Sequence, residues 1–200
     1  MKVKYITIER EYGSGGTEIA RKLAAQTGVA CYGREILEQV SRDNDIPIDQ
    51  IERYEESISG SFLYSVFVMS KAASGDTDML TAEGYIYVAE QAVIRHMANH
   101  GPSVFLGHCA SEALKDYDGV IKVYIRCSDE AAVKARIEGY GIESDKAEAQ
   151  KRKFDKKRAN YYYANTLKKW EDLKNYDLVL DSGTLGIDGC VSVLAALISE

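Results

Sequence analysis

Short apolar runs alternate along the chain with longer segments in which apolar residues recur at helical spacing. The apolar runs predict five strands, at residues 3–8, 29–32, 103–107, 120–126 and 176–181. The longer segments predict helices over residues 17–27, 34–42, 49–56, 81–100, 128–138 and 187–199. This alternation predicts an α/β fold, with a five-stranded parallel sheet and helices on both faces.

The length of 200 residues predicts one domain, residues 1–200, with two inserts. A helical lid insert is expected at about 140–165. A second insert, at about 34–80, either binds an acceptor or forms an interface. Within it, residues 57–78 are rich in aromatic and apolar side chains, which could pack under the lid or against another molecule.

Composition and charge narrow the class of protein. With 46% apolar residues the chain can bury a good core, and a net charge of −6 argues against nucleic acid or an anionic membrane surface as partner. The first residues, "MKVKYITIE", lack the apolar region of a signal peptide, and the apolar run "SFLYSVFVMSKAA" is too short to span a bilayer. We therefore expect a cytoplasmic protein.

The cysteines and two of the histidines do not predict a metal site. The four cysteines are far apart and form no CxxC pair, so they are expected to be reduced and mostly buried. His96 and His100 are four residues apart on a predicted helix, but no HExxH pattern accompanies them. We expect both histidines to lie on the helix surface.

A glycine-rich turn follows the first predicted strand and precedes an amphipathic helix. The stretch "YGSGGTE" supplies Gly13, Gly15 and Gly16, together with the hydroxyl groups of Ser14 and Thr17. Small residues allow backbone amides to close around a phosphate, and the helix dipole favours the anion. In the pattern GxxxxGK[ST], Gly16 stands where the lysine should be, while Thr17 matches the magnesium ligand. The alternative is a turn whose glycines serve tight packing alone.

Arg10 could replace the missing lysine, because it lies at the end of the strand beside the loop. Transfer of a phosphoryl group needs a cation near the charge that spreads in the transition state. Arginine suits phosphate, but Glu9 and Glu11 could equally pair with Arg10 on the surface. Both interpretations stay open from the residues alone.

The segment "QKRKFDKKR", residues 150–158, places six basic residues beside one acid in an otherwise acidic chain. On a helix, Lys151, Asp155, Arg158 and Tyr162 share one face. Asp155 could hold one arginine, either Arg152 or Arg158, while other cations grip phosphate. Such a helix could serve as a lid that closes over substrates and excludes water. The alternative is a solvated charged face.

His108 follows Gly107 at the end of the third predicted strand, where ligands bind in parallel sheets. It could contact a phosphate or a base, or simply cap the strand end. Tyr161 to Tyr163 and Trp170 are expected to pack under the lid insert.

Several of these pieces together resemble the cytidylate kinase-like family, a branch of the P-loop nucleoside monophosphate kinases. They are "ITIEREYGSGGTEIARKLA", "CYGREIL", "VFLGHCA", "VYIR", "DKKRANYY" and "YDLVLDSGTLG", which span nearly the whole chain in order. The chain resembles the subgroup in which "GSGG" replaces "GSGK". In that subgroup an arginine is expected where His108 stands.

The resemblance implies a P-loop kinase fold, ATP with Mg²⁺ as donor, and a nucleoside monophosphate, nominally CMP, as acceptor. Residues 13–17 would bind donor phosphates, with Thr17 as the metal ligand, and Arg34 and His108 would contact the acceptor. The residues implied near the adenine are Asp181, Ser182 and Gly183. The implied catalytic set is Arg10, Arg152, Asp155 and Arg158.

We therefore expect an ATP-dependent nucleotide kinase with a small-molecule nucleotide as its partner. Three alternatives remain. The protein could be a nucleotide-binding regulator that has lost catalysis, since the lysine is missing. It could phosphorylate a different small acceptor. It could also be an interaction module in which residues 57–73 form a homodimer face.

Overall fold

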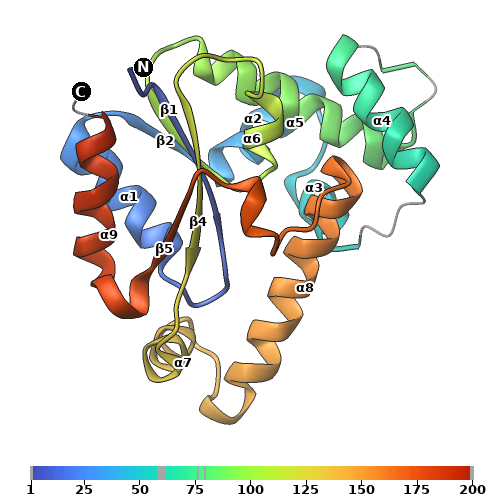
Figure 1. Ribbon diagram of the computed structural model, residues 1–200. Helices are drawn as coiled ribbons and strands as arrows, with labels where there is room; N and C mark the ends of the chain where they lie inside the picture. Colours follow the sequence, from blue (N-terminus) through green and yellow to red (C-terminus); the bar gives the residue numbers. More distant parts are fainter. Residues whose placement is uncertain (1, 58–61, 76, 79, 199–200) are drawn as a thin grey trace.

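The computed structural model describes residues 2–57, 62–75, 77, 78 and 80–198. Within these ranges one sheet has five strands, all parallel, in the order β2-β3-β1-β4-β5. The strands are β1 (Tyr5–Arg10), β2 (Ala30–Tyr32), β3 (Ser103–Leu106), β4 (Val120–Arg126) and β5 (Leu178–Asp181). The predicted α/β fold with a five-stranded parallel sheet is confirmed, and Figure 1 shows helices on both faces.

Helices occupy most of the segments between the strands. The first group is α1 (Gly16–Thr27), α2 (Arg34–Asn44), α3 (Ile48–Ser57), α4 (Phe62–Ser74) and α5 (Ala82–Ala98). The second group is α6 (Ala110–Ala113), α7 (Glu130–Gly139), α8 (Ala147–Thr166) and α9 (Ser182–Ile198). Of the predicted interface at 57–73, residues 58–61 lie outside the described residues. Two helical segments make up α9, because Gly186 is non-helical (φ 68°, ψ 172°), and the predicted helix from residue 187 corresponds to the second segment.

One face of the sheet is covered by α1 and α9 (Figure 1). The alternation of side chains along β1 sends Ile6 and Ile8 to this face, where both are fully buried. They pack against Leu23 of α1 and Leu194 of α9. This packing fixes α1 directly behind the turn that follows β1.

The opposite face carries a second core built largely from aromatic side chains. Tyr5, Phe105 and Tyr124 of the sheet pack there with residues of α2, α5 and α8. The same alternation that sends Ile8 to α1 sends Glu9 to this face, where the indole of Trp170 meets it. Trp170 is 2% exposed, so it is core as expected from the sequence.

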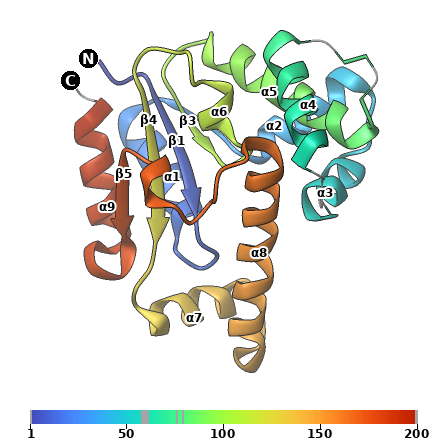
Figure 2. The same cartoon turned by 45° about the vertical axis from the view of Figure 1, so that its right-hand side comes forward.

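The segment predicted as a lid insert, about 140–165, contains a short 3-10 turn at Ser144–Lys146 and nearly all of α8, and α7 precedes it. Figure 2 shows α7 and the start of α8 beyond the carboxyl ends of β1 and β4. The rest of α8 runs alongside the second core. Helix α8 therefore contacts the glycine-rich turn in its first half and packs with the core around Trp170 near its end.

No helix in the described part of the chain is long and apolar enough to cross a membrane. The four cysteines are free, and three of them are buried. The rings of His96 and His100 lie 4.7 Å apart, and His100 Nδ1 lies 2.9 Å from the His96 carbonyl oxygen. Across the described ranges, no group of three or more His, Cys, Asp or Glu residues is placed to hold a metal ion.

Candidate active site

The turn after β1 has the backbone geometry of an anion-binding loop. Gly13 and Gly15 have φ values of +78° and +80°, a region in which a side chain would be strained. Gly15 caps α1 without a side-chain hydrogen bond, so the amides of the first helical turn are not covered by a cap. Such amides, together with the helix dipole, favour a phosphate group.

The two hydroxyl residues of this loop are placed differently. Ser14 is fully buried, and its Oγ donates to the Glu11 carbonyl oxygen over 2.8 Å. Its own carbonyl accepts from Ser182 Oγ at 2.6 Å. Ser14 therefore shapes the loop from inside, whereas Thr17 is exposed on the first turn of α1.

Arg10 occupies the space that a side chain on residue 16 would need. A Cβ added to Gly16 would lie 2.6 Å from Arg10 Cβ and 2.8 Å from Arg10 Cγ. Farther along the side chain, Arg10 Nη1 lies 2.4 Å from the position of a Cβ on Gly107. The Arg10 side chain thus passes beside the glycine-rich turn, and its guanidinium reaches the end of β3.

The acids beside Arg10 have other partners. Glu9 is buried rather than on the surface, and its Oε2 accepts from Trp170 Nε1 over 3.1 Å. Glu11 Oε2 lies 3.3 Å from Lys151 Nζ. These contacts weaken the interpretation in which Arg10 belongs to a surface ion pair.

Helix α8 is held against the loop through Asp155. The Tyr12 amide donates to Asp155 Oδ1 over 2.7 Å, and Lys151 Nζ donates to Asp155 Oδ2 over 2.7 Å. The Phe154 ring stacks on the Tyr12 ring with centroids 4.4 Å apart. Asp155 therefore joins α8 to the glycine-rich turn.

The two lid arginines differ in position. Arg158 Nη1 donates to the Arg10 carbonyl oxygen over 2.9 Å, which places its guanidinium at the end of β1. Arg152 is 72% exposed and pairs with Glu148 on the outer side of α8. The structure brings Arg158 to the site and leaves Arg152 outside it.

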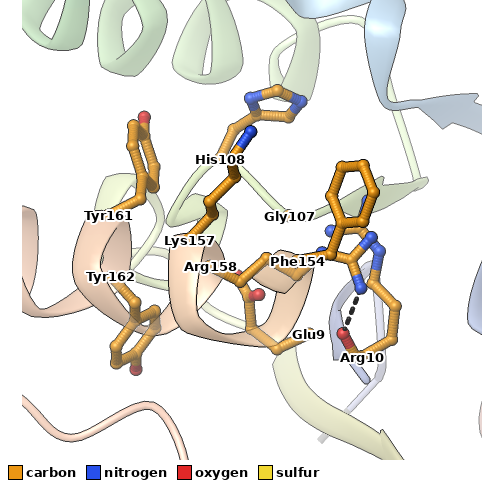
Figure 3. Close-up of a pocket in the computed structure, with 9 residues that line it drawn as sticks. All are labelled: Glu9, Arg10, Gly107, His108, Phe154, Lys157, Arg158, Tyr161 and Tyr162. Carbon is orange, nitrogen blue, oxygen red and sulfur yellow. Dashed lines mark hydrogen bonds between the residues drawn. The ribbon is translucent and has the colours of Figure 1, made fainter. Parts of the chain in front are cut away.

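A hollow of about 210 Å³ lies where the ends of β1 and β3 face α8. It is lined by Glu9, Arg10, Gly107, His108, Phe154, Lys157, Arg158, Tyr161 and Tyr162, shown in Figure 3. Three cationic side chains and one carboxylate therefore surround a small space beside the phosphate loop. Burial raises the pKa of the Glu9 carboxyl above its ordinary value, although Arg10, the Trp170 indole, Arg158 and His108 act in the opposite direction.

His108 reaches this hollow on a strained turn. Its φ of 57° lies in the left-handed region, and its carbonyl oxygen accepts from Gln91 Nε2 over 3.2 Å. Strain of this kind in a non-glycine residue is often found at functional sites. By contrast Arg34 pairs with Glu52 and Glu38 on the surface and does not line the hollow.

At the end of β5, Ser182 contacts the glycine-rich turn, and Asp181 binds the backbone beside it. Asp181 Oδ1 accepts from the amides of Ser128 and Gly183, both over 2.9 Å. Ser182 Oγ donates to Ser14, as described above. Their predicted place near an adenine stays a prediction.

Arg136 of α7 is a residue of this site that the sequence did not reveal. Its Nη1 donates to the Gly13 carbonyl oxygen over 3.2 Å and lies 3.4 Å from Ser182 Oγ. Its guanidinium carbon is 3.6 Å from the position of a Cβ on Gly15. Arg136 does not belong to the basic run, so only the fold brings it to the loop.

We expect Arg136→Ala to weaken ATP binding, because it removes a cation and a hydrogen bond from the phosphate loop. A charge-assisted contact contributes about 1.5–3 kcal/mol, which corresponds to a roughly 10- to 150-fold rise in Kd. Isothermal titration with ATP and Mg²⁺ measures this change. Lys134→Ala, an exposed change on the same helix, is the matched control; equal affinities of the two variants would contradict the assignment.

Comparison with known proteins agrees with this geometry. A sequence model described as the cytidylate kinase-like family matches residues 5–184. A search of curated proteins found no match. Among solved structures, an uncharacterized protein from Eubacterium ventriosum is 26% identical with a TM-score of 0.71, and the match covers 98% of each chain.

Two shikimate kinases also share the fold at lower identity. The enzyme from Bacteroides thetaiotaomicron is 12% identical with a TM-score of 0.51, over 98% of each chain. The enzyme from Acinetobacter baumannii, solved in complex with shikimate, is 13% identical with a TM-score of 0.50, over 98% of this chain and 94% of that one. These likenesses show the P-loop kinase fold.

Proposed function

Because the chain belongs to the cytidylate kinase-like family, we propose that it transfers the γ-phosphoryl group of ATP to a small acceptor. Its fold, which is that of small-molecule kinases, agrees with this proposal. The observation that carries this proposal is the position of Arg10. Its side chain fills the place of the missing lysine and extends into the hollow between the phosphate loop and the lid. The lost cation is thereby replaced from the neighbouring strand.

The residues around the loop fit a nucleoside triphosphate with its metal ion. The loop amides and the side chains of Arg10, Arg136 and Arg158 would hold the phosphates. Mg²⁺ in such sites is bound mainly by phosphate oxygens and water, and Thr17 Oγ1 is the protein ligand that we propose. When bound, the ion would neutralise charge on the transferring group.

Each side chain has a distinct part in the transfer. Arg10 and Arg158 would offset the negative charge that spreads over the γ-phosphoryl oxygens. Asp155 would hold the lid on the loop, so that water is excluded while the reaction occurs. The acceptor would occupy the hollow beside His108. CMP is the acceptor that the family description suggests, and a different small acceptor is the alternative.

Binding of ATP provides the first test. With ATP–Mg²⁺ at 100 times its Kd, native-state binding stabilises the fold by about 2.7 kcal/mol. For a chain of this length, we expect the Tm to rise by about 5–10 °C. The measurement is a calorimetric scan, with Mg²⁺ alone at the same concentration as control, and an unchanged Tm would contradict nucleotide binding.

A coupled assay for ADP then separates a kinase from a regulatory protein. A kinase forms ADP faster when an acceptor is added, over a panel of nucleoside monophosphates and small hydroxyl compounds. Stabilisation by ATP without ADP formation would favour the inactive, nucleotide-binding regulator.

We further propose that the protein works in the cytoplasm. We also propose that residues 57–73 form a homodimer face, and a measurement of the molar mass in solution tests this.

A further inference from the structure

We propose that the atom phosphorylated by this protein is a hydroxyl oxygen of a small anionic acceptor, and that Glu9 accepts the proton of that hydroxyl. The inference rests on the proposed phosphoryl transfer and names its acceptor class. It starts from one observation: a buried carboxylate lines the hollow in which the acceptor would sit.

Glu9 is fixed in the hollow by its surroundings. It belongs to the central strand β1, and its side chain is only 8% exposed. The indole of Trp170, itself 2% exposed, donates to Oε2 and so sets the orientation of the carboxyl group. Figure 3 shows the Glu9 side chain at the same hollow as Arg10 and Arg158.

Charged and titratable groups from every neighbouring element surround Glu9. The cationic or ionisable ones are Arg10 of β1, Arg158 of α8 and His108 after β3. The phenols that interact with it are Tyr124, Tyr162 and Tyr176. Burial nevertheless raises the pKa of Glu9, which moves it toward the range in which a general base is effective near neutral pH.

A carboxylate at this point suits a hydroxyl acceptor better than a phosphate acceptor. A phosphate monoester already carries a charge of about −1.5 to −2 at neutral pH, so its oxygen attacks without losing a proton. A neighbouring buried carboxylate would repel it. An alcohol, in contrast, must lose its proton as it attacks, and Glu9 lies where that proton can be taken up.

The proposed step is a single displacement at the γ-phosphorus. The acceptor oxygen forms a bond to the γ-phosphorus, and the bond from that phosphorus to the β,γ-bridging oxygen of ATP breaks. The electron pair of the broken bond leaves with ADP. The hydroxyl proton moves to the Glu9 carboxylate, and the product is a phosphate monoester.

Size and charge further restrict the acceptor. The volume of about 210 Å³ lies below the roughly 300–1,000 Å³ of pockets that hold drug-sized ligands, so it suits a compact molecule better than a whole nucleotide. Lys157 and His108 also line the hollow, and Figure 3 shows the Lys157 amine extending toward the side where His108 lies. The ammonium group of Lys157 at that side favours an acceptor that carries its own carboxylate or phosphate.

The identity of the product tests this inference. The full-length protein is incubated with ATP–Mg²⁺ and one of two acceptor sets. The first set contains shikimate, glycerol 3-phosphate and ribose 5-phosphate, and the second contains CMP, UMP, AMP and GMP. Phosphorus NMR distinguishes a new monoester from a phosphoanhydride. We expect monoester products, with turnover highest in the first set.

The variant Glu9→Gln tests the role of the carboxylate. The amide keeps the size of the side chain and an oxygen that can accept from Trp170, but it is a poor base. General-base catalysis contributes typically 10²–10⁴-fold, so we expect kcat to fall at least about 100-fold while the Kd of ATP stays unchanged. Glu143→Gln, a change in an exposed side chain that pairs with Lys146, is the matched control.

The pH profile separates a base from a merely structural residue. Glu9 must be ionised to act, so kcat of the unaltered protein should fall as the pH decreases through the raised pKa of this carboxyl. That fall should lie above the ordinary glutamate value of about 4.3 and should disappear in Glu9→Gln. If Glu9 had only a structural role, Glu9→Gln would lower kcat at all pH values, and the fall of kcat at low pH would remain.

The outcomes also separate this inference from the proposed function. Phosphoanhydride as the sole product, with Glu9→Gln within about threefold of the unaltered protein, would overturn the hydroxyl acceptor and leave the kinase intact. ATP binding without ADP formation from either set would remove both. If Glu9→Gln does not fold, the product made by the unaltered protein, a monoester or a phosphoanhydride, still shows whether the acceptor atom is a hydroxyl oxygen.

Discussion

Restoring the lysine of the phosphate loop is expected to damage this protein. In Gly16→Lys, the new Cβ would lie 2.6 Å from Arg10 Cβ, closer than side chains approach in folded proteins. Either Arg10 is displaced from the hollow or the start of α1 shifts. Loss of the Arg10 contact alone corresponds to about 1.5–3 kcal/mol, and we expect kcat/KM for ATP to fall roughly 10- to 150-fold.

A double variant makes this prediction specific. Arg10→Gly combined with Gly16→Lys removes the collision and supplies the lysine, so it should recover activity relative to Gly16→Lys alone. Gly16→Ala adds only the colliding Cβ and separates steric from charge effects. A rise in kcat/KM for Gly16→Lys alone would show that Arg10 does not occupy the lysine's place.

Removing the side chain of Arg10 is expected to have a comparable effect. Arg10→Ala deletes the cation beside the transferring group while leaving the loop backbone in place. The loss of a charge-assisted contact, about 1.5–3 kcal/mol, predicts a fall of roughly 10- to 150-fold in turnover or ATP affinity. Single-turnover kinetics and titration with ATP separate these two effects.

The control for Arg10 is an arginine that has no part in the site. Arg53 is 79% exposed and pairs with Asp49 on α3, so Arg53→Ala should leave turnover unchanged. Arg10→Lys should recover only part of the activity, because lysine lacks the planar fork of donors. Unchanged kinetics in Arg10→Ala would make it a structural residue of the strand end.

The sheet could be predicted because its strands are short, apolar and separated by helices with clear spacing. Helix ends were harder to predict, since they depend on caps and turns. The last helix illustrates this, because the sequence suggested the segment after Gly186 but not the short helical segment that begins at Ser182 before this non-helical glycine. No helix or strand was predicted within residues 57–78, because their apolar character carries no clear period, and α4 lies there.

The site was predictable only where it is local in sequence. The glycine loop and Arg10 lie within eight residues of one another, and their order along the chain suggested a phosphate site. Arg136 contacts the loop, and Trp170 contacts Glu9, only because the tertiary fold brings these distant segments together. Exposure also could not be predicted, and it distinguishes Arg152 from Arg158 although both belong to one basic run.

The contact between Asp155 and the Tyr12 amide has a consequence for how tightly a nucleotide can bind. While α8 rests on the loop through this contact, a nucleotide from solvent would reach the loop only after the contact opens. If only a fraction of the protein is open, the measured Kd equals the intrinsic Kd divided by that fraction. The contact would then weaken the apparent affinity for the nucleotide while it helps to keep water from the reacting groups.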